Sequence, residues 1–294
     1  MSRALVTGGL GFVGSNLVDL LLQRGHQVTV IDNLCSESSS RSYMRPEVEY
    51  WIDDVRNLDK QKYAGQGFHY VFHLAALARI QPSFTDPVGY ISSDVMGTAH
   101  VLEYARKCGA KRLVYAGSSS AYGGPMLNPY AWAKYTGEQA CEMYSEVYGL
   151  STAVARFFNV YGHRQPRTGA WATVVGVFEE QSAKGLPLTV TGDGEQRRDF
   201  THVSDIVEGL YALSQEGPKS GEIYNLGTGK NYSINELAEM FGGPISYIPA
   251  RPGEARTTLA DISRTTEATG WKPKFSIEDY IHQHRLELAA RKKT

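Results

Sequence analysis

The feature that most constrains this chain is a glycine-rich turn within its first fifteen residues. An apolar run over residues 4–7 leads into Gly8, Gly11 and Gly14, and a largely apolar segment follows over residues 16–22. This order predicts a strand, a tight turn and a helix, because glycine reaches positive φ and lets the backbone approach a ligand closely. The helix N-terminus would then present unpaired N–H groups to a pyrophosphate. Three spaced glycines on their own are also compatible with a plain turn.

A second signal is the acid that ends the next apolar strand, over residues 27–32. Asp32 stands at about the distance from the glycine turn at which a Rossmann domain places its ribose-binding carboxylate. A carboxylate there can accept both ribose hydroxyls and repels a 2′-phosphate, so the position favours NAD over NADP. The alternative is a surface acid at a strand end.

Strand and helix signals alternate through the first half of the chain. Strands are expected at residues 51–56, 70–76, 112–117 and 151–156, and helices at 94–108 and 132–148. Short apolar strands alternating with helices predict an α/β fold with a doubly wound parallel sheet, covered by helices on both faces. We place this Rossmann domain at residues 1–162 and expect the segment at about 199–227 to return to it.

Beyond Gly162 the pattern changes to pieces punctuated by proline and glycine, which predicts a smaller, loop-rich C-terminal lobe over residues 163–294. A helix over 203–213 and a strand over 222–226 are expected to rejoin the sheet or its edge. Ser233 and Glu236 have the spacing of a capping box and predict the start of a helix in the lobe.

Composition excludes several classes of partner. The 294 residues carry a formal net charge of -1, and the three cysteines have no metal-ligand spacing. Without a basic field, neither nucleic acid nor an anionic membrane surface is expected as a partner. No apolar run reaches the length of a membrane span, and no signal peptide precedes the first strand. We therefore expect a cytoplasmic protein with reduced cysteines and no bound metal.

The central candidate for chemistry is the pair Tyr130 and Lys134. Residues four apart share one face of a helix, so the phenol and the ammonium group can point into the same pocket. A free phenol has a pKa of about 10, and a nearby cation lowers that pKa by favouring the phenolate. Tyr130 would then be a usable general base near neutral pH. The same spacing occurs on solvated helices, but here it follows a glycine turn, a strand-end acid and a strand ending in hydroxyl residues.

Taken together, these motifs resemble the extended short-chain dehydrogenases/reductases of the nucleotide-sugar epimerase/dehydratase family, and within it the UDP-hexose 4-epimerases. The resemblance runs almost from end to end. It rests on residues 8–14, 32–33, 54–55, 73–76, 118–123, 130–134, 156–162, 192–200 and 251–254.

The resemblance implies NAD as cofactor. The glycine turn would hold the pyrophosphate and Asp32 the adenosine ribose, while Asp54, with a turn acid as the alternative, would contact the adenine. Phe158 would line the nicotinamide pocket, with core packing as an equal alternative. The whole implied set is Gly8, Gly11, Phe12, Val13, Gly14, Asp32, Asn33, Asp54, Val55, Leu74, Ala75, Ala76, Asp94, Tyr130, Lys134 and Phe158.

The resemblance also implies the catalytic groups. Tyr130 would be the base, Lys134 would tune it and bind the nicotinamide ribose, and Ser118 would bridge the sugar O4 to the tyrosine. Sibling dehydratases and decarboxylases usually carry an acid directly after the catalytic hydroxyl, where this chain has Ser119 and Ser120. This difference favours a 4-epimerase that passes through a 4-keto sugar and regenerates NAD in each turnover.

The implied substrate is a UDP-sugar. Asn159, Arg198 and Arg251 would contact its diphosphate and Glu254 its ribose; without the resemblance, these charges would be read as solvated. Thr258 occupies the place of a gate residue beside the sugar C2 substituent, and its short side chain leaves space for an N-acetyl group. We therefore expect UDP-GlcNAc and UDP-GalNAc, with UDP-Glc and UDP-Gal as further substrates.

Two alternatives stay open. One is a UDP-glucuronate 4-epimerase or another dehydratase or decarboxylase of the family, and the other is a non-catalytic NAD-binding protein. The chain also departs from its relatives in two places. The loop over residues 124–128 is short, and Asp94 stands where relatives often have Asn, either favouring the oxidised nicotinamide or starting a helix. The helices at 94–108 and 132–148 resemble those that form a four-helix bundle in family homodimers.

Overall fold

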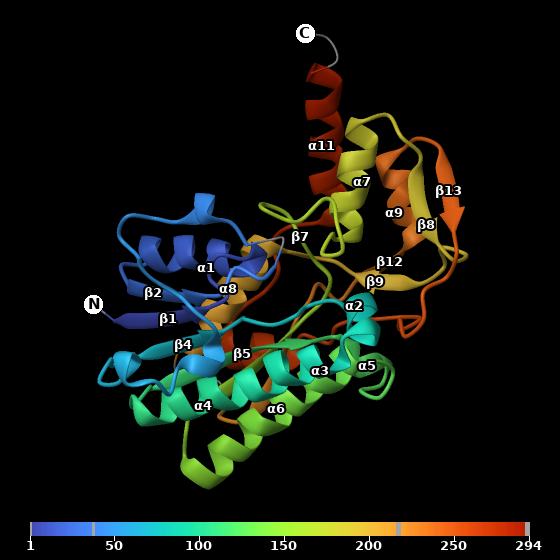
Figure 1. The fold of residues 1–294 in the computed structure, drawn as a ribbon. Helices are drawn as coiled ribbons and strands as arrows, with labels where there is room; N and C mark the ends of the chain where they lie inside the picture. Colours follow the sequence, from blue (N-terminus) through green and yellow to red (C-terminus); the bar gives the residue numbers. More distant parts are fainter. Residues whose placement is uncertain (1, 37–38, 216–218, 292–294) are drawn as a thin grey trace.

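The computed structural model describes residues 2–36, 39–215 and 219–291 (Figure 1). Seven parallel strands form the central sheet in the order β11-β6-β5-β4-β1-β2-β3. Their bounds are β1 (Arg3–Thr7), β2 (Gln27–Asp32), β3 (Glu49–Ile52), β4 (Tyr70–His73), β5 (Arg112–Ser118), β6 (Thr152–Phe157) and β11 (Glu222–Leu226). This order confirms the doubly wound fold. The strand order reverses between β1 and β4, where such sheets bind ligands beyond the strand ends.

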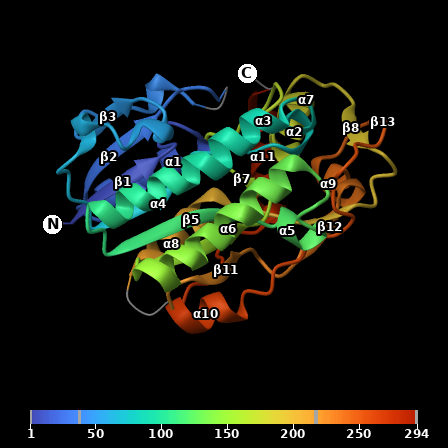
Figure 2. The same ribbon diagram turned by 60° about the horizontal axis from the view of Figure 1, so that its bottom comes forward.

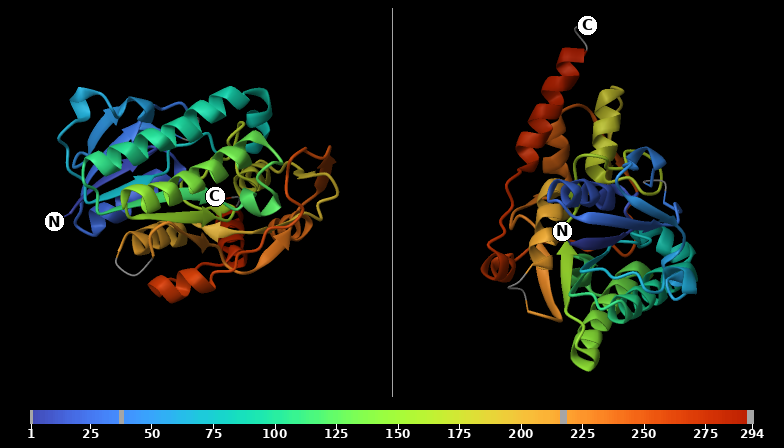
Figure 3. Two further views of the ribbon diagram at one scale, coloured as in Figure 1. Left: turned by 90° about the horizontal axis from the view of Figure 1, so that it is seen from below. Right: turned by 90° about the vertical axis from the view of Figure 1, so that its left-hand side faces the viewer.

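Helices cover both faces of the sheet because successive side chains of each strand point to opposite faces. Val6 of β1 belongs to the core that includes α1 (Phe12–Gln23) and α8 (Val203–Ser214). Its neighbour Leu5 belongs to the core that includes α4 (Gly97–Lys107) and α6 (Pro129–Tyr148). The views in Figure 3 show the sheet between these two layers of helices.

A third core forms the C-terminal lobe. It joins Phe178, Val190, Leu237 and Ile281 from α7 (Val174–Ala183), β8 (Leu188–Thr191), α9 (Ile234–Phe241) and α11 (Ile277–Arg291). β8 pairs in parallel with β13 (Ile245–Ile248), and β9 (Arg197–Asp199) pairs with β12 (Asn231–Ser233). The predicted capping box is confirmed, since the Ser233 hydroxyl accepts from the Glu236 N–H and the Glu236 carboxylate accepts from the Ser233 N–H.

The chain passes between the two regions more than once. After β7 (Val160–Tyr161) and β10 (Thr201–His202) pair in parallel, α8 packs against α1. β11 then pairs with β6, from Glu222 beside Ala153 to Leu226 beside Phe157. The helix and the strand predicted to rejoin the sheet therefore do so. The division of the chain at residue 162 stays a prediction.

Two helices near the site begin earlier than predicted. The chain is helical from α3 (Pro87–Tyr90), capped by Asp86, through the π-helical η4 (Ile91–Met96) into α4. Likewise α6 begins at Pro129, because the Asn128 side chain caps it by accepting from the Ala131 N–H at 2.7 Å. Apolar periodicity alone does not register such polar caps.

Short elements complete the described chain. They are η1 (Arg41–Tyr43), η2 (Val55–Asn57), η3 (Gln61–Tyr63), α2 (Ile80–Thr85), α5 (Ser120–Gly123) and α10 (Ser263–Thr269). Over the described residues, no helix has both the length and the apolar character needed to cross a bilayer.

Candidate active site

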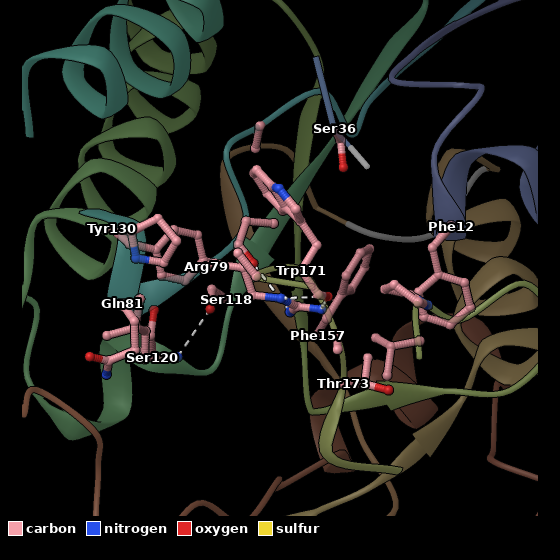
Figure 4. A pocket seen from close by; sticks show the side chains of 18 of the residues that line it. Phe12, Ser36, Arg79, Gln81, Ser118, Ser120, Tyr130, Phe157, Trp171 and Thr173 are labelled. Carbon is pink, nitrogen blue, oxygen red and sulfur yellow. Dashed lines mark hydrogen bonds between the residues drawn. The ribbon is translucent and has the colours of Figure 1, made fainter. Parts of the chain in front are cut away.

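A pocket of about 1050 Å³ opens at the carboxyl ends of the sheet strands and extends to loops of the C-terminal lobe (Figure 4). It is lined by the turn after β1, by the ends of β2, β4, β5 and β6, and by Arg251, Gly253, Glu254, Ala255 and Thr258. Pockets for single small ligands usually have about 300–1,000 Å³. This one therefore has room for more than one ligand.

The pocket brings together all the predicted site residues except Phe158 and Asp94. Phe158 is 0% exposed, and its ring centroid lies 5.7 Å from that of Tyr122. This is the geometry of the packing alternative, while its neighbour Phe157 lines the pocket. Asp94 is also buried.

The glycine turn has the close approaches that its sequence predicts. Gly8 has φ +69°, and a Cβ there would lie 2.9 Å from the Ala75 nitrogen. A Cβ on Gly14 would lie 2.1 Å from the Gly8 carbonyl oxygen. Gly11 is the N-cap of α1 and has no side chain with which to cap it. The first turn of α1 thus lines the pocket in a cradle that side chains would fill, which fits a pyrophosphate.

Asp32 has a structural task in addition to the predicted one. Its Oδ2 accepts from the Leu10 N–H at 3.0 Å, and its Oδ1 accepts from the Leu34 N–H at 2.8 Å. Burial raises the pKa of this carboxyl group. The side chain therefore holds the glycine turn and also accepts from Ser39, and its remaining acceptor capacity would serve a ribose hydroxyl.

Asp54 lies at the same end of the pocket. Arg56 pairs with it at 2.7 Å and lowers its pKa to about 2, and the Asn33 side chain donates to it at 3.0 Å. Asp54 also caps η2 by accepting from the Arg56 N–H. Both the predicted cofactor contact and the turn acid are thus compatible with its position.

The Tyr130–Lys134 pair lies on the first turns of α6, and both side chains line the pocket. Ser118, the last residue of β5, accepts from the Ser120 N–H at 3.2 Å. Figure 4 shows Ser118 and Tyr130 among the side chains that surround the pocket. The structure therefore brings together the three residues predicted to be catalytic.

The expected effect of Lys134 on the phenol is not what the structure shows. Burial raises the pKa of Tyr130 above its usual value, while hydrogen bonding to Ser118 opposes that rise. The Lys134 ammonium lies 4.4 Å from the centroid of the Tyr115 ring and interacts with Asp94 and Glu138, and burial lowers its pKa. Burial therefore has the largest effect on the pKa of Tyr130.

A buried chain of hydrogen bonds was not predicted. Thr98 donates to the Asp94 carbonyl at 2.5 Å, so it accepts from His73 Nε2 at 3.0 Å. His73 Nδ1 then accepts from the Thr7 hydroxyl at 2.8 Å, and Thr7 accepts from the Ala75 N–H at 3.1 Å. Burial lowers the pKa of His73 to about 3, which keeps the ring neutral. The available sequence signal was that two apolar strands, β1 and β4, end in the polar residues Thr7 and His73.

Asp94 joins this chain from within η4. Its Oδ1 accepts from the Leu77 N–H at 2.8 Å, and its Oδ2 has no hydrogen-bond partner among the described residues. Burial raises its pKa to about 6, and Lys134 opposes that rise. Because the chain is already helical from Pro87, Asp94 does not start a helix. Its predicted effect on the nicotinamide stays a prediction.

On the opposite side of the pocket, predicted binding residues contact one another. Arg198 donates to the Arg197 carbonyl at 3.0 Å and pairs with Glu254 at 3.4 Å. The Asn159 side chain lies 3.5 Å from the Thr258 hydroxyl, and Thr258 is buried. Arg251 is exposed at the rim.

Several lining residues were missed by sequence reasoning. Arg79 Nε donates to the Trp171 carbonyl at 2.8 Å, and Gln81 donates to the Pro252 carbonyl at 3.0 Å. Asn128 donates to the Gly253 carbonyl at 2.9 Å, so the short loop over 124–128 packs on the segment over 251–255. The one sequence signal for Arg79 was a charged residue three positions after a predicted strand that ends in small residues. Within the described chain, no group of His, Cys, Asp and Glu residues could hold a metal ion.

Comparisons with known proteins agree with this geometry. The model of the NAD dependent epimerase/dehydratase family matches residues 4–227. A putative UDP-glucose 4-epimerase of Methanocaldococcus jannaschii is 35% identical over 94% of this chain and 95% of its own. The structure of a Thermotoga maritima UDP-glucose 4-epimerase with UDP-glucose is similar at a TM-score of 0.90, with 30% identity over 99% of this chain and all of the other.

A third similarity is to the UDP-N-acetylglucosamine 4-epimerase of Methanobrevibacter ruminantium, solved with UDP-N-acetylmuramic acid. That structure gives a TM-score of 0.87 and 30% identity over 98% of this chain and 97% of its own. The extent of the match to the family model, together with these full-length similarities, establishes the relationship. The chain belongs to the NAD dependent epimerase/dehydratase family.

Proposed function

We propose that this protein catalyses the NAD-dependent 4-epimerisation of a UDP-hexose through a 4-keto sugar. The observation that carries the proposal is that Tyr130 and Ser118 line the same pocket as the glycine turn and the Arg198–Glu254 pair. This arrangement suits a cofactor on one side, a nucleotide on the other and the reacting sugar between them.

The residues present fit NAD. The cradle between Gly8 and Gly14 accommodates a pyrophosphate, and the Asp32 carboxylate disfavours a 2′-phosphate. Lys134 would bind the nicotinamide ribose. Bound NAD supplies a hydride acceptor that can return the hydride in the same turnover.

Tyr130 would take the proton of the sugar O4 hydroxyl, with Ser118 bridging the two groups. The Ser118 hydrogen bond and the positive charge of Arg79 both favour the phenolate and oppose the effect of burial. Directly after Ser118, where related dehydratases and decarboxylases usually carry an acid, this chain has Ser119 and Ser120. Without a carboxylate at that position, elimination and decarboxylation are disfavoured. Proton removal and return at one oxygen is then the chemistry that these side chains support.

Nucleotide binding would require Arg198 and Glu254 to exchange partners. The Glu254 carboxylate lies 3.4 Å from the Arg198 guanidinium, and the oxygens of a diphosphate would be stronger acceptors for it. Once released, the Glu254 carboxylate could accept from a ribose hydroxyl. Arg251 and Asn159 would complete the diphosphate site.

We propose UDP-GlcNAc and UDP-GalNAc as substrates, with UDP-Glc and UDP-Gal also accepted. The support is Thr258, a short side chain in the lining of the pocket. Thr258→Tyr should reduce turnover of the N-acetylated sugars at least about 10-fold more than that of UDP-glucose, because a phenol ring would occupy the space of the acetyl group. Equal losses on both substrates would contradict this gate.

The direct test is to incubate the purified protein with UDP-GlcNAc and UDP-glucose and to resolve the products by chromatography. The C4 epimers should accumulate to equilibrium without net formation of NADH. Bound NAD without any product would favour the non-catalytic alternative.

We also propose a homodimer formed through α4 and α6, which lie side by side across one face (Figure 2). Apolar side chains along α6 are exposed there, including Met143 at 42% and Val147 at 64%. Large exposed apolar side chains gathered on one face are typical of an association surface. Analytical ultracentrifugation should give twice the mass of the chain, and Val147→Glu should shift the protein towards monomer. A monomer at high concentration would contradict the proposal.

A further inference from the structure

Among the described residues that line the pocket, Arg79 is the one cation to which the family resemblance gives no role. Arg79 follows β4 and is the N-cap residue of α2. Its side chain extends into the pocket towards Trp171 in Figure 4. It is also close enough to Tyr130 for the positive guanidinium to favour the phenolate. Arg79 therefore lies at the reacting end of the pocket.

The hydrogen bonds of Arg79 go to neutral backbone acceptors. Nε and Nη2 donate to the Trp171 carbonyl, and Nη1 donates to the Ala78 carbonyl at 3.2 Å. Among the described residues, no carboxylate forms an ion pair with this guanidinium. Burial lowers its pKa, which shows that its surroundings disfavour the charge. A partly buried cation without a counter-ion is costly, and a bound anion would offset that cost.

Two of the other pocket cations have charged neighbours, and the third, Arg251, is exposed to solvent at the rim. Lys134 interacts with Asp94 and Glu138, and Arg198 pairs with Glu254. The proposed diphosphate sites are the glycine turn and the group of Arg198, Arg251 and Asn159, whereas Arg79 lies near Tyr130, where the hexose would react. An anion at Arg79 would therefore belong to the hexose.

We infer that Arg79 binds a carboxylate on the hexose, so that the site prefers a UDP-hexuronate to the corresponding neutral UDP-hexose. This inference rests on the proposed function and names its substrate class. The planar guanidinium can donate two parallel hydrogen bonds to a carboxylate. A charged carboxylate is also a stronger acceptor than the Trp171 carbonyl, so it can replace that contact. The carboxylate bound by Arg79 is a different substituent of the hexose from the C2 N-acetyl group that Thr258 would admit.

The test compares the binding of UDP-glucuronate and UDP-glucose to the NAD-loaded protein by calorimetry. The wild type should bind UDP-glucuronate more tightly. Arg79→Gln keeps polar donors but removes the charge, and it should weaken UDP-glucuronate binding about 10- to 100-fold and UDP-glucose binding less than about 3-fold. Arg79→Lys should retain part of the preference, because it keeps the charge but loses the planar fork.

Arg24→Gln is the matched control. It removes an exposed arginine that pairs with Glu208 outside the pocket, and it should leave both affinities unchanged. If Arg79→Gln does not fold, the ratio of the two affinities in Arg79→Lys decides. Equal weakening of both sugars would overturn the inference, because it would make Arg79 a bridge between two loops. A wild-type preference for UDP-glucose would overturn it as well.

Turnover of both sugars, measured in parallel, separates the two proposals. Epimerisation of UDP-glucose without any effect of Arg79 on the preference would overturn this inference alone. Preferred binding of UDP-glucuronate without conversion of either sugar would support it and overturn the proposed activity. Binding of neither sugar would overturn both.

Discussion

The two sides of the pocket are built differently. On the sheet side, Gly8, Asp32 and Tyr130 are positioned by backbone geometry and by the ends of β1, β2 and α6. On the lobe side, Arg198 of the short strand β9 pairs with Glu254, which lies on a loop. The sheet side is thus preformed in this structure, whereas the lobe side would have to exchange partners to bind the proposed nucleotide. This difference suggests that chemistry and cofactor binding depend on the fixed side, and that substrate choice depends on the exchangeable side.

The largest effect is expected on the sheet side, at Tyr130. Tyr130→Phe removes the hydroxyl proposed to carry the proton and should lower kcat by about 1000-fold or more. Binding of NAD, followed by calorimetry, should be unchanged. The control Tyr247→Phe removes an exposed hydroxyl in the lobe that donates to Asn235, and it should keep full activity. Wild-type turnover in Tyr130→Phe would rule out the assigned base.

A second test asks whether the glycine cradle is as fixed as its geometry indicates. In Gly14→Ala, the new Cβ would meet the Gly8 carbonyl at 2.1 Å. We expect a loss of about 3 kcal/mol in the free energy of unfolding and NAD binding weakened at least about 10-fold. Gly25→Ala is the control, with φ +76° but nothing within 4 Å of the Cβ. It should cost about 1 kcal/mol and leave NAD binding intact. Similar NAD affinities in both variants would contradict the cradle.

On the lobe side, Arg198→Gln should weaken UDP binding about 10- to 100-fold, because it removes charge-assisted hydrogen bonds to the diphosphate. NAD binding should change little, because NAD would bind on the sheet side of the pocket. Calorimetry with UDP and with NAD measures both affinities. Arg264→Gln removes an exposed arginine 3.7 Å from Glu222 and serves as the control. If Arg198→Gln weakens both ligands equally, the two sides are coupled and the comparison fails.

The smallest effect is expected from the buried histidine of the sheet side. The pKa of His73 is about 3 in the folded protein, below its usual value of 6.5, so the unfolded chain binds the additional proton between these values. The free energy of unfolding should therefore fall on acidification below pH 6.5, by up to about 1.4 kcal/mol per pH unit. His73→Gln keeps one donor and one acceptor. Its free energy of unfolding, measured by denaturant titration, should fall less between pH 7 and pH 5 than that of the wild type. An equal fall in the free energy of unfolding in both proteins would exclude His73 as the titrating group.

Much of the sheet side could be predicted because local sequence rules govern it. The glycine turn, Asp32 at a strand end and the Tyr130–Lys134 spacing each depend on neighbours within a few residues. The doubly wound parallel sheet followed from the alternation of strands and helices, whereas the order of its strands was not predicted. The energetic consequences did not follow, since the pKa of Tyr130 depends on burial by segments far away in the sequence.

The lobe side was predicted mainly through family resemblance. The Arg198–Glu254 pair joins residues 56 positions apart, and the contact between Arg79 and Trp171 spans 92 positions. No periodicity or cap links such distant residues, so the sequence pattern does not specify which charges pair. For the same reason Arg79 had no predicted role.

The sequence by itself determined the doubly wound sheet, the glycine turn at its switch point and the helix that carries Tyr130 and Lys134. Each of these depends on backbone conformation and on helix or strand periodicity, which act over short stretches of chain. Only the tertiary structure decided which charges face the pocket with a partner and which, like Arg79, face it without one. Desolvation and ion pairing depend on segments that meet only after the chain has folded.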